Sequence, residues 1–326
     1  MYGKISGSLD RRAVLGAIGI AAMTAVSGCT TPQGSSRQGF FERTGLPIGL
    51  QVYTLGDEAG KDIDATFASI AAIGYREIEI PGLLGHAPAD VKAAADRAGL
   101  TISSIHVPLV AMGQSGGLTF GRDASDIAET LGVLGAKWAV APIALFPPDF
   151  RPSGGDFAAD VGKAFAAAGP DIWKRTAEML NRRAEALQPL GIQVGYHNHN
   201  LEFLPIGDTN GWEILARETD PSLVRFEVDL GWIATSGLEP VAFLQEYAGR
   251  IALIHVKDVA SGNQVNHGLA MKPTEVGAGT LSWETLLPAA YAAGARHFYV
   301  EQEPPFTIPR IEAARRGYDF LAGLIA

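Results

Sequence analysis

The sequence predicts an α/β protein folded as a single (β/α)8 barrel, because eight short apolar runs of β type alternate with Ala-rich segments of helical period. Hydrophobic residues make up 47% of the 326 residues, which is enough to build a large core. An open doubly wound sheet usually carries a Gly-rich phosphate-binding turn, and the sequence contains no G-x-G-x-x-G or P-loop motif. A glycine that can end the helix follows several helical segments: Gly74, Gly99, Gly135, Gly191 and Gly294.

The strands and helices are expected in regular order along the chain. The β-type runs cover residues 48–53, 77–81, 102–107, 138–142, 193–197, 224–229, 252–257 and 297–302. Helices are expected near 62–73, 87–98, 123–134, 170–189, 211–217, 239–248, 282–293 and 308–325, where apolar residues recur three and four positions apart. Segment 144–169 is longer than an ordinary connection, so we expect it to fold over the barrel mouth. Segment 260–279 is expected to be a second mouth loop.

The N-terminus is expected to be a targeting segment. Arg11 and Arg12 precede an uncharged apolar run over 13–26, which is too short to span a bilayer comfortably. The twin arginine is typical of a Tat-type export signal. The run ends in Val26-Ser27-Gly28-Cys29, which resembles a lipoprotein cleavage box whose cysteine becomes the lipidated first residue. The alternative for Cys29, the only cysteine of the chain, is a buried apolar thiol.

These features predict three regions and a location. We expect a Tat/lipoprotein signal peptide over 1–28, a flexible tether rich in Gly, Ser and Gln over 29–46, and the barrel over 47–326. The mature protein would be periplasmic and lipid-anchored through Cys29. The formal net charge of −9 repels phosphate backbones, so nucleic acid is an unfavourable partner. The sequence leaves homo-oligomerisation open.

The carboxyl ends of the predicted strands carry an unusual number of polar residues. Functional side chains of such barrels lie at these ends. The residues concerned are His106, His197, His199, Glu227, Asp229, His255, Lys257, Glu301 and Glu303. Residues two apart on a strand point to the same side, and burying so many charges costs several kcal/mol per ion unless a counter-charge is present. A divalent cation is the simplest counter-charge, and mixed carboxylate and imidazole ligands suit Mn, Mg, Co or Zn.

Four segments resemble those of a known family: YHNHNLEF (196–203), EVDLGW (227–232), IHVKD (254–258) and YVEQE (299–303). From Pro47 to the C-terminus the chain resembles the xylose isomerase-like TIM-barrel superfamily, with its sugar isomerases and epimerases and its inosose dehydratase-like and 3-keto-glycoside-processing branches. The resemblance implies one divalent ion held by residues from strands five to eight, here Glu202, Asp229, His255 and Glu301. The epimerases place a glutamate on strand five itself, where this chain has His197. Glu202 would therefore reach back from the next loop, and His197 or His199 is the alternative ligand.

The resemblance to the epimerases suggests that Glu202 and Glu301 act as two bases across the ion. If Lys257 or His106 instead donates a proton to a leaving oxygen, the same intermediate would undergo elimination. Substrate contacts are expected from four residues: His197, His199, Glu79 and Trp232.

Three functions remain open on this basis. The first is a divalent-metal-dependent sugar isomerase or epimerase that transfers a proton next to a carbonyl through an enediolate. The second is a lyase that uses the same intermediate to eliminate a group from 3-keto-glycosides or keto-inositols. The third is a sugar-binding lipoprotein without catalysis. An endonuclease on the same barrel is disfavoured by the acidic charge. An exported protein would meet free sugars or glycosides rather than sugar phosphates.

Overall fold

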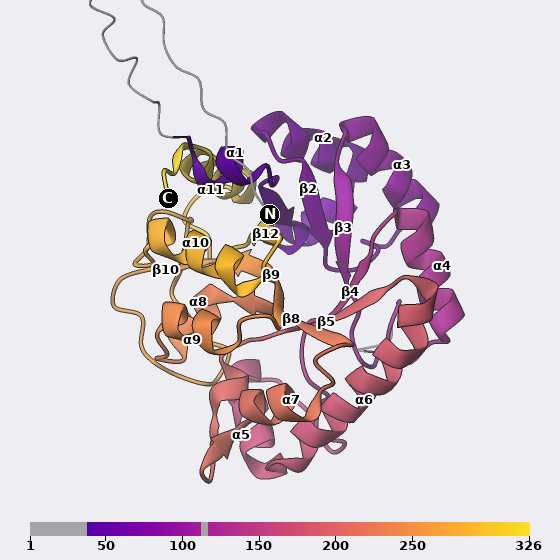
Figure 1. Ribbon diagram of the computed structural model, residues 1–326, viewed down its shortest axis with the longest axis vertical. Coiled ribbons are helices and arrows are strands. Elements are labelled where there is room, and N and C mark those ends of the chain that lie inside the picture. The colour runs from indigo at the N-terminus through magenta and orange to yellow at the C-terminus, as the bar shows by residue number, and fades with distance from the viewer. Residues whose placement is uncertain (1–37, 112–116) are drawn as a thin grey trace, which may run out of the picture. The chain divides into compact units, whose positions relative to one another are not determined.

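The computed structural model describes residues 38–111 and 117–326, which fold around a closed barrel of eight parallel strands (Figure 1). The strand order around the barrel is β1-β12-β9-β8-β5-β4-β3-β2. The bounds are Gly49–Gln51 for β1, Glu77–Ile80 for β2, Thr101–His106 for β3, Trp138–Ala141 for β4, Gln193–His197 for β5, Val224–Asp229 for β8, Ile251–Val256 for β9 and His297–Val300 for β12. The predicted (β/α)8 barrel is confirmed.

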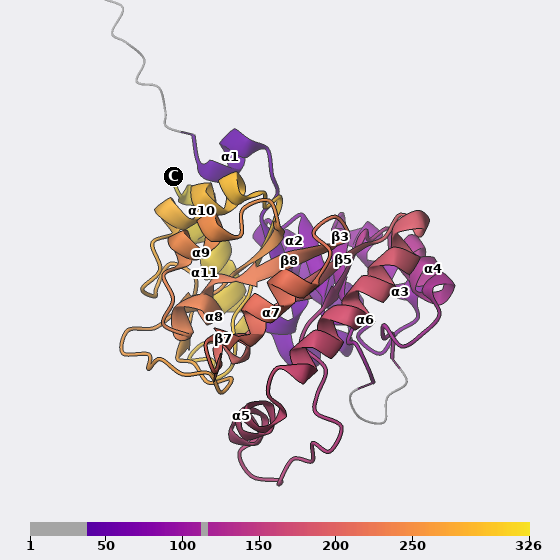
Figure 2. The same ribbon diagram turned by 60° about the horizontal axis from the view of Figure 1, so that its bottom comes forward.

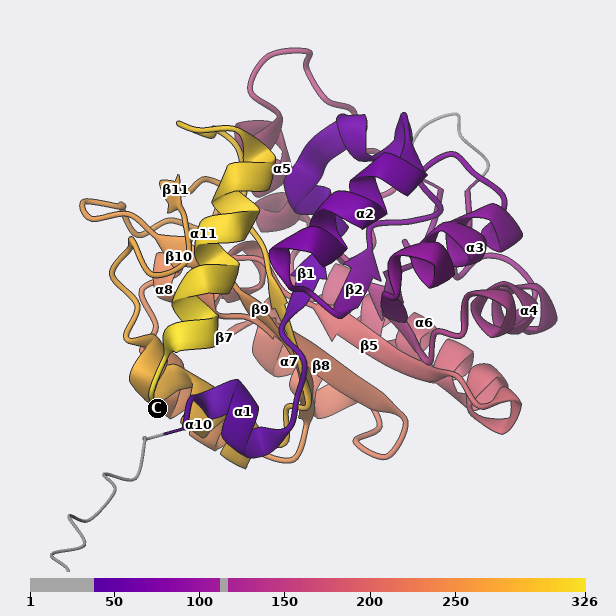
Figure 3. The same ribbon diagram turned by 90° about the horizontal axis from the view of Figure 1, so that it is seen from above.

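Helices cover the outside of the barrel, as Figures 2 and 3 show from two further directions. They are α2 (Ile63–Ile73), α3 (Pro88–Ala98), α4 (Ala124–Leu134), α6 (Asp171–Leu187), α7 (Gly211–Glu218), α9 (Pro240–Glu246), α10 (Trp283–Ala293) and α11 (Arg310–Gly323). Each presents an apolar face to the sheet. In α2 the side chain of Asp62 accepts the Ala65 N–H at the start, and Phe67 and Ile70 are fully buried.

The structure adds elements that the sequence patterns did not predict. Helix α5 (Phe157–Ala168) lies within the long segment 144–169, and α8 (Leu230–Thr235) begins directly after β8. The first predicted strand ends at Gln51, where a 3-10 helix (Val52–Gly60) begins. Two short hairpins occur outside the barrel: β6 (Pro205–Ile206) with β7 (Thr209–Asn210), and β10 (Asp258–Val259) with β11 (Pro273–Thr274).

The barrel domain begins earlier than the predicted boundary at residue 47. Residues 40–44, which the sequence assigned to the tether, form helix α1 (Phe40–Thr44) with buried Phe40 and Phe41. The Phe40 N–H donates to the Leu324 carbonyl oxygen at 3.0 Å, so α1 is joined to the end of the chain. The predicted signal peptide and Cys29 lie outside the described residues. In the part of the chain that the structure describes, no helix has the length and apolar character needed to cross a membrane.

The barrel interior is divided into an apolar and a polar layer. Trp138, Val140, Leu253 and Tyr299 form a small buried cluster inside the barrel, separate from the main core between strands and helices. Nearer the carboxyl ends, the strand register aligns His197 with Glu227 and Asp229 with His255 on neighbouring strands. The register therefore brings polar side chains from different strands to the same level.

Candidate metal and active site at the barrel mouth

A pocket of about 690 Å³ opens at the carboxyl ends of the strands. Its wall combines apolar and titratable side chains: Tyr53, Pro81, His106, Pro108, Pro142, Ile143, His197, His199, Trp232, Leu269, Ala270, Met271, Glu301, Glu303 and Pro304. Leu269 to Met271 come from the predicted second mouth loop, which therefore reaches the pocket. Among the described side chains of segment 144–169, none belongs to this lining, so the expected cover of the mouth by that segment is not seen at the pocket.

A cluster of five buried side chains forms the base of the pocket and continues below it. Its members come from five strands and are Glu79, His106, His197, Glu227 and His255. His106 Nε2 lies 3.0 Å from Glu227 Oε2 and 3.1 Å from Glu79 Oε1. His255 Nε2 lies 2.8 Å from Glu79 Oε1 and 3.2 Å from Glu227 Oε2. Two glutamates thus hold two imidazoles by their Nε2 atoms.

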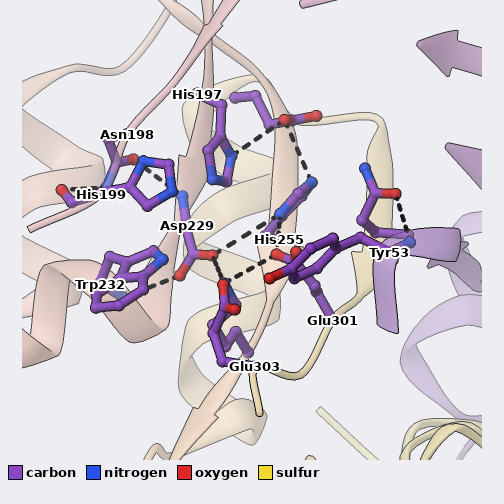
Figure 4. Close-up of polar contacts among 12 residues, drawn as sticks. Tyr53, His197, Asn198, His199, Asp229, Trp232, His255, Glu301 and Glu303 are labelled. Carbon is purple, nitrogen blue, oxygen red and sulfur yellow. Dashed lines mark hydrogen bonds and ion pairs between the residues drawn. The ribbon is translucent and has the colours of Figure 1, made fainter. Parts of the chain in front are cut away.

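A second set of charged groups surrounds Lys257 nearer the mouth. Its Nζ lies 2.9 Å from Asp229 Oδ2, 2.9 Å from Glu301 Oε2 and 3.0 Å from Glu303 Oε1. Glu301 Oε2 also accepts from His255 Nδ1 at 2.6 Å. Figure 4 shows Asp229, His255 and Glu301 directed toward one another, with Trp232 and Tyr53 on either side. The Lys257 ammonium is the counter-charge of this set, and it is fully buried.

Local backbone structure fixes the positions of these groups. Asp229 is the N-cap of α8, where its Oδ1 accepts the Trp232 N–H at 2.9 Å. The Asp229 N–H donates to Asn198 Oδ1 at 3.0 Å, which links the ends of β8 and β5. A Cβ on Gly231 would lie 2.8 Å from the Lys257 carbonyl oxygen, so only glycine lets α8 pass this close to the end of β9.

Electrostatic surroundings give His106, His255, Lys257 and Asp229 unusual proton affinities. Burial opposes the charged form of His255, but the charges of Glu227 and Glu301 raise its pKa well above its usual value. Burial alone would lower the pKa of His106, but the charge of Glu79 and the hydrogen bond to Glu227 raise it to about 10. Burial likewise opposes the charged form of Lys257, but the charge of Asp229 keeps its pKa well above the usual value. Burial raises the pKa of Asp229 to about 6, although the Lys257 ammonium acts in the opposite direction. His106 and Lys257 are therefore cations at neutral pH.

Glu202 is placed differently from the sequence expectation. It lies on the 3-10 helix Leu201–Phe203 and is fully buried. The Tyr196 hydroxyl donates to its Oε1 at 2.6 Å, and the His199 N–H donates to its Oε2 at 2.9 Å. Tyr196 packs in the core between barrel and helices, so it turns the carboxylate away from the pocket. Burial raises the pKa of Glu202 to about 7, although both hydrogen bonds lower it.

Two overlapping groups of donor atoms have the spacing that a metal ion requires. Within each group the ligand atoms all lie within 4.8 Å of one another. The first group consists of His106, His197, Glu227 and His255, and the second of His197, Asp229, His255 and Glu301. The second contains three of the four residues expected from the sequence, with His197 in place of Glu202. Among the described residues, Glu202 lies outside both groups.

The other predicted residues divide between the pocket wall and the layer beneath it. His106, His197, His199, Trp232 and Glu301 line the pocket. Burial, followed by the Lys257 charge, lowers the pKa of His199 to about 3, so this ring is neutral. Its centroid lies 5.5 Å from the Trp232 ring.

Glu79, expected to bind substrate, lies beneath the pocket instead. It accepts from Gln51 Nε2 at 2.7 Å and from the Ser104 hydroxyl. Lys257 is likewise covered, by its three carboxylate partners.

Sequence reasoning missed Tyr53 and the partners of Glu79. Tyr53 lines the pocket from the 3-10 helix after β1. Burial and the charges of Glu303 and Glu301 raise its pKa above the ordinary range. The alternation of side chains along a strand would have indicated that Gln51 and Ser104 point into the barrel, since each lies two residues from another position that faces inward. No comparable pattern marks Tyr53, because it follows the strand on an irregular turn.

Comparison with known proteins identifies the family. Residues 67–324 match the family model described as xylose isomerase-like TIM barrel, and the chain belongs to this family. It is thus a member of an enzyme superfamily, among whose relatives are inosose dehydratases and a sugar phosphate isomerase/epimerase.

Individual relatives extend the comparison. The chain is 26% identical over 205 residues to an inosose dehydratase of Geobacillus kaustophilus, a match that covers 63% of this chain and 64% of the relative. An inosose dehydratase of Lacticaseibacillus casei is 35% identical over 91 residues, or 27% of this chain and 29% of the relative. The chain therefore matches less than two thirds of the length of these curated relatives.

Solved structures show the same fold. A sugar phosphate isomerase/epimerase from Parabacteroides distasonis has a TM-score of 0.64 and 25% identity, with 93% of this chain and 99% of that chain covered. The IolI protein with a bound zinc atom has a TM-score of 0.57 and 14% identity over 86% of this chain and 98% of that chain. At that identity the second likeness concerns the fold alone.

Proposed function

We propose that the protein is a divalent-metal-dependent lyase that eliminates water from a keto-cyclitol or keto-sugar after proton abstraction next to the carbonyl. The observation that carries this proposal is the asymmetry of the pocket. Carboxylates of Glu301 and Glu303 lie on one wall, and the cationic His106 lies among the other lining residues. Elimination needs one base and one acid, whereas epimerisation by two bases needs a second base on the opposite face of the substrate. The residue expected to supply it, Glu202, is turned away.

The donor atoms fit a divalent ion. His197 Nδ1 and Asp229 Oδ2 are buried, the first 3.2 Å from Glu227 Oε2 and the second 2.9 Å from Lys257 Nζ, and both belong to the group with Glu301 and His255. These four residues would hold the ion. Carboxylate oxygens with imidazole nitrogens suit Mn, Mg, Co or Zn. When bound, such an ion would polarise the substrate carbonyl and stabilise the negative charge that develops on its oxygen.

The side chains of the pocket supply the proton transfers. Glu303 would take the proton from the carbon next to the carbonyl, and its Oε1 lies 3.0 Å from the Lys257 ammonium. The bond between the β-carbon and its hydroxyl oxygen then breaks. His106 is held by Nε2 to two glutamates, which leaves Nδ1 to donate a proton to the departing hydroxyl. Water leaves, the proton on Glu303 returns to solvent, and His106 takes up a proton from solvent, so that both groups regain their starting states. Trp232 and the neutral His199 would bind the polyol face.

The experiment is incubation of the protein with inososes and 3-keto-glycosides in D2O, with divalent ions added or removed by a chelator. We expect an ion-dependent product lighter by one water. His106→Asn should slow water loss about 10²–10⁴-fold, as expected for a general acid, while the α-carbon still exchanges deuterium. Glu303→Gln should lose both reactions.

Each other outcome favours an alternative function. Deuterated epimers without water loss would identify the metal-dependent isomerase or epimerase that the sequence also allows. Tight sugar binding without exchange would identify a binding protein. Water loss that persists in His106→Asn at the wild-type rate would refute the role of His106.

We further propose that this chemistry takes place in the periplasm on free sugars, with the protein lipid-anchored through Cys29. The support is the twin arginine and the cleavage box of the N-terminal sequence. Globomycin-sensitive labelling of the protein with a radioactive fatty acid tests the anchor. The control is the Cys29→Ser variant, which should not be labelled. Equal labelling of wild type and Cys29→Ser would contradict a lipid anchor at Cys29.

A further inference from the structure

We propose that the pocket contains a subsite, beside the polar one, that binds an uncharged aromatic substituent of the substrate. Its surface, which we call the apolar wall, consists of Pro81, Pro108, Pro142, Ile143, Leu269 and Met271. Asn200 positions the part of this wall that comes from the loop 260–272. The inference rests on the proposed function, because it names the class of substrate that the same pocket accepts.

The pocket is larger than a single sugar ring requires. Its volume of about 690 Å³ lies within the range of roughly 300–1,000 Å³ found for pockets that enclose drug-sized molecules. An inosose or a keto-hexose is one six-membered ring, so either would leave part of this volume unfilled. A ring bound at the carboxylates and imidazoles therefore leaves room for a substituent attached to it.

Polar and apolar lining residues lie on different sides of the rim. Pro81 follows β2 directly, Pro108 comes after β3, and Pro142 follows β4 directly. These three strands are consecutive around the barrel, and β4 lies four places from β12 in either direction. Glu301 follows β12, so Pro142 lies on the opposite side of the rim from this carboxylate. Among the described lining residues, the side formed by β2 to β4 is apolar except for His106.

The lining lacks a free partner for an anionic substituent. Among the described residues, no lysine or arginine side chain lines the pocket. Lys257 is fully buried, with its Nζ 2.9–3.0 Å from three carboxylate oxygens. The charge of His106 is compensated by the two glutamates at its Nε2. Glu301 and Glu303 would repel a phosphate or carboxylate, so the charges of the pocket favour an uncharged substituent.

The side chains of the apolar wall suit a flat ring. All six are half-buried, so each leaves apolar surface exposed. Proline fixes its own backbone φ, and a rigid surface loses little conformational freedom on binding. The thioether of Met271 adapts to its neighbours and makes favourable contacts with aromatic rings. A second polyol would bind less well here, because its hydroxyl groups would lose water without gaining hydrogen-bond partners.

Asn200 holds the loop 260–272 in a defined position. This side chain is fully buried. Its Nδ2 donates to the backbone and side-chain oxygens of Asn266 at 2.9 and 2.8 Å, and its Oδ1 accepts the Leu269 N–H at 2.9 Å. Asn266 Nδ2 in turn donates to the Ala270 carbonyl oxygen at 2.8 Å. The two asparagines thus fix the stretch of backbone that carries the loop's part of the apolar wall.

The same contacts maintain an unusual backbone conformation. Leu269 has a φ of 58°, in the left-handed region that residues other than glycine seldom adopt. Such conformations persist where the surrounding contacts determine them, and they cluster at ligand-binding sites. On its other side the loop approaches α5, where a Cβ on Gly162 would lie 3.9 Å from the Gly268 Cα. The loop is therefore held between Asn200 and α5, and its part of the apolar wall is preformed.

The experiment measures the dissociation constants of methyl, phenyl and 4-carboxyphenyl β-D-glucoside by isothermal titration calorimetry. The three probes share one sugar ring, and they carry no ketone, so they do not undergo the proposed elimination. Wild type should bind the phenyl glucoside at least about tenfold more tightly than the methyl glucoside, because burying most of a phenyl ring is worth about that ratio or more. The 4-carboxyphenyl glucoside should lose most of this gain.

Substitutions test the apolar wall and the loop separately. Met271→Ser should reduce the preference for phenyl over methyl to about threefold or less and leave the affinity for the methyl glucoside unchanged. Asn200→Ala and the less buried Asn266→Ala should reduce the same preference, with faster amide hydrogen exchange across 260–272. Val265→Ser is the matched control, because Val265 lies on the same loop, is 64% exposed and is not among the described lining residues. It should keep the wild-type preference.

The outcomes separate this subsite from the proposed lyase. Equal affinities of wild type for the methyl and phenyl glucosides, or no binding of any probe, would overturn the subsite. Tight binding of the 4-carboxyphenyl glucoside would contradict an uncharged substituent, and an unchanged preference in both asparagine variants would contradict the role of Asn200. Water loss from an inosose, which has no such substituent, tests the lyase. Water loss without a phenyl preference overturns the subsite alone, and a phenyl preference without water loss overturns the lyase alone.

Discussion

Replacing Glu202 with glutamine should make the protein progressively more stable than wild type as the pH rises from 5 to 8. The pKa of Glu202 is raised from 4.5 to about 7, chiefly by burial. In the unfolded chain this carboxyl loses its proton near pH 4.5, while in the folded protein it keeps the proton to about pH 7. The unfolded state therefore binds fewer protons over this window, and the stability of wild type falls as the pH rises.

The size of the effect follows from the shift. At 1.36 kcal/mol per pKa unit, the penalty is about 3 kcal/mol above pH 7, of which roughly 2–3 kcal/mol develops between pH 5 and 8. Glutamine cannot ionise, so Glu202→Gln lacks the penalty, although its amide replaces one accepting oxygen at a cost that is the same at both pH values. The difference in the free energy of unfolding between variant and wild type therefore changes with pH only through the ionisation of Glu202.

Urea denaturation of wild type and variant at pH 5 and pH 8 measures this quantity. Glu129→Gln, at an exposed position on α4, is the control and should show no such trend. A stability difference that stays constant with pH would refute the burial argument. We also expect Glu202→Gln to bind Co²⁺ as wild type does. Loss of Co²⁺ binding in this variant would indicate that Glu202 is a metal ligand.

Two further substitutions test the surroundings of Lys257. Lys257→Met removes a buried ammonium from three carboxylate oxygens at 2.9–3.0 Å, and it should lower stability by about 3–5 kcal/mol. Added Mn²⁺ should restore part of this loss in thermal denaturation, and equal losses with and without the ion would contradict a cation site there. Gly231→Ala places a Cβ 2.8 Å from the Lys257 carbonyl oxygen and should cost about 1–3 kcal/mol. Gly132→Ala is its matched control, because a Cβ there meets no described atom within 4 Å, and it should stabilise α4 by about 0.5–1 kcal/mol; equal effects at both glycines would contradict the packing argument.

The barrel was predictable because its strands follow a simple rule. In β8, Val224, Phe226 and Val228 pack outward in the main core, while Glu227 and Asp229 belong to the polar groups of the barrel interior. This alternation marks both the strand and the side chains that it directs toward the site. Helix α8 was not predicted because it begins without a connecting segment, and its only sequence signal is Asp229 acting as N-cap.

The ligand set was predicted less completely because one residue lies beyond the end of its strand. His197 is the last residue of β5, and the strand itself fixes where its ring points. Glu202 lies in an irregular turn, where the direction of its side chain depends on which hydrogen-bond donors bind the carboxylate. The Tyr196 hydroxyl and the His199 N–H do so here, and no periodic pattern indicates that tertiary contact. Glu79 was similarly undetermined, because burial beneath the pocket depends on partners from three other strands.

Crystals of the protein grown with Zn²⁺ and, separately, with Mn²⁺ would locate the ion directly by anomalous diffraction. We expect an anomalous peak inside the carboxyl end of the barrel, about 2.0–2.1 Å from a nitrogen of both His197 and His255. Ions found only outside the barrel, with both imidazoles still bound to their neighbouring carboxylates, would contradict it.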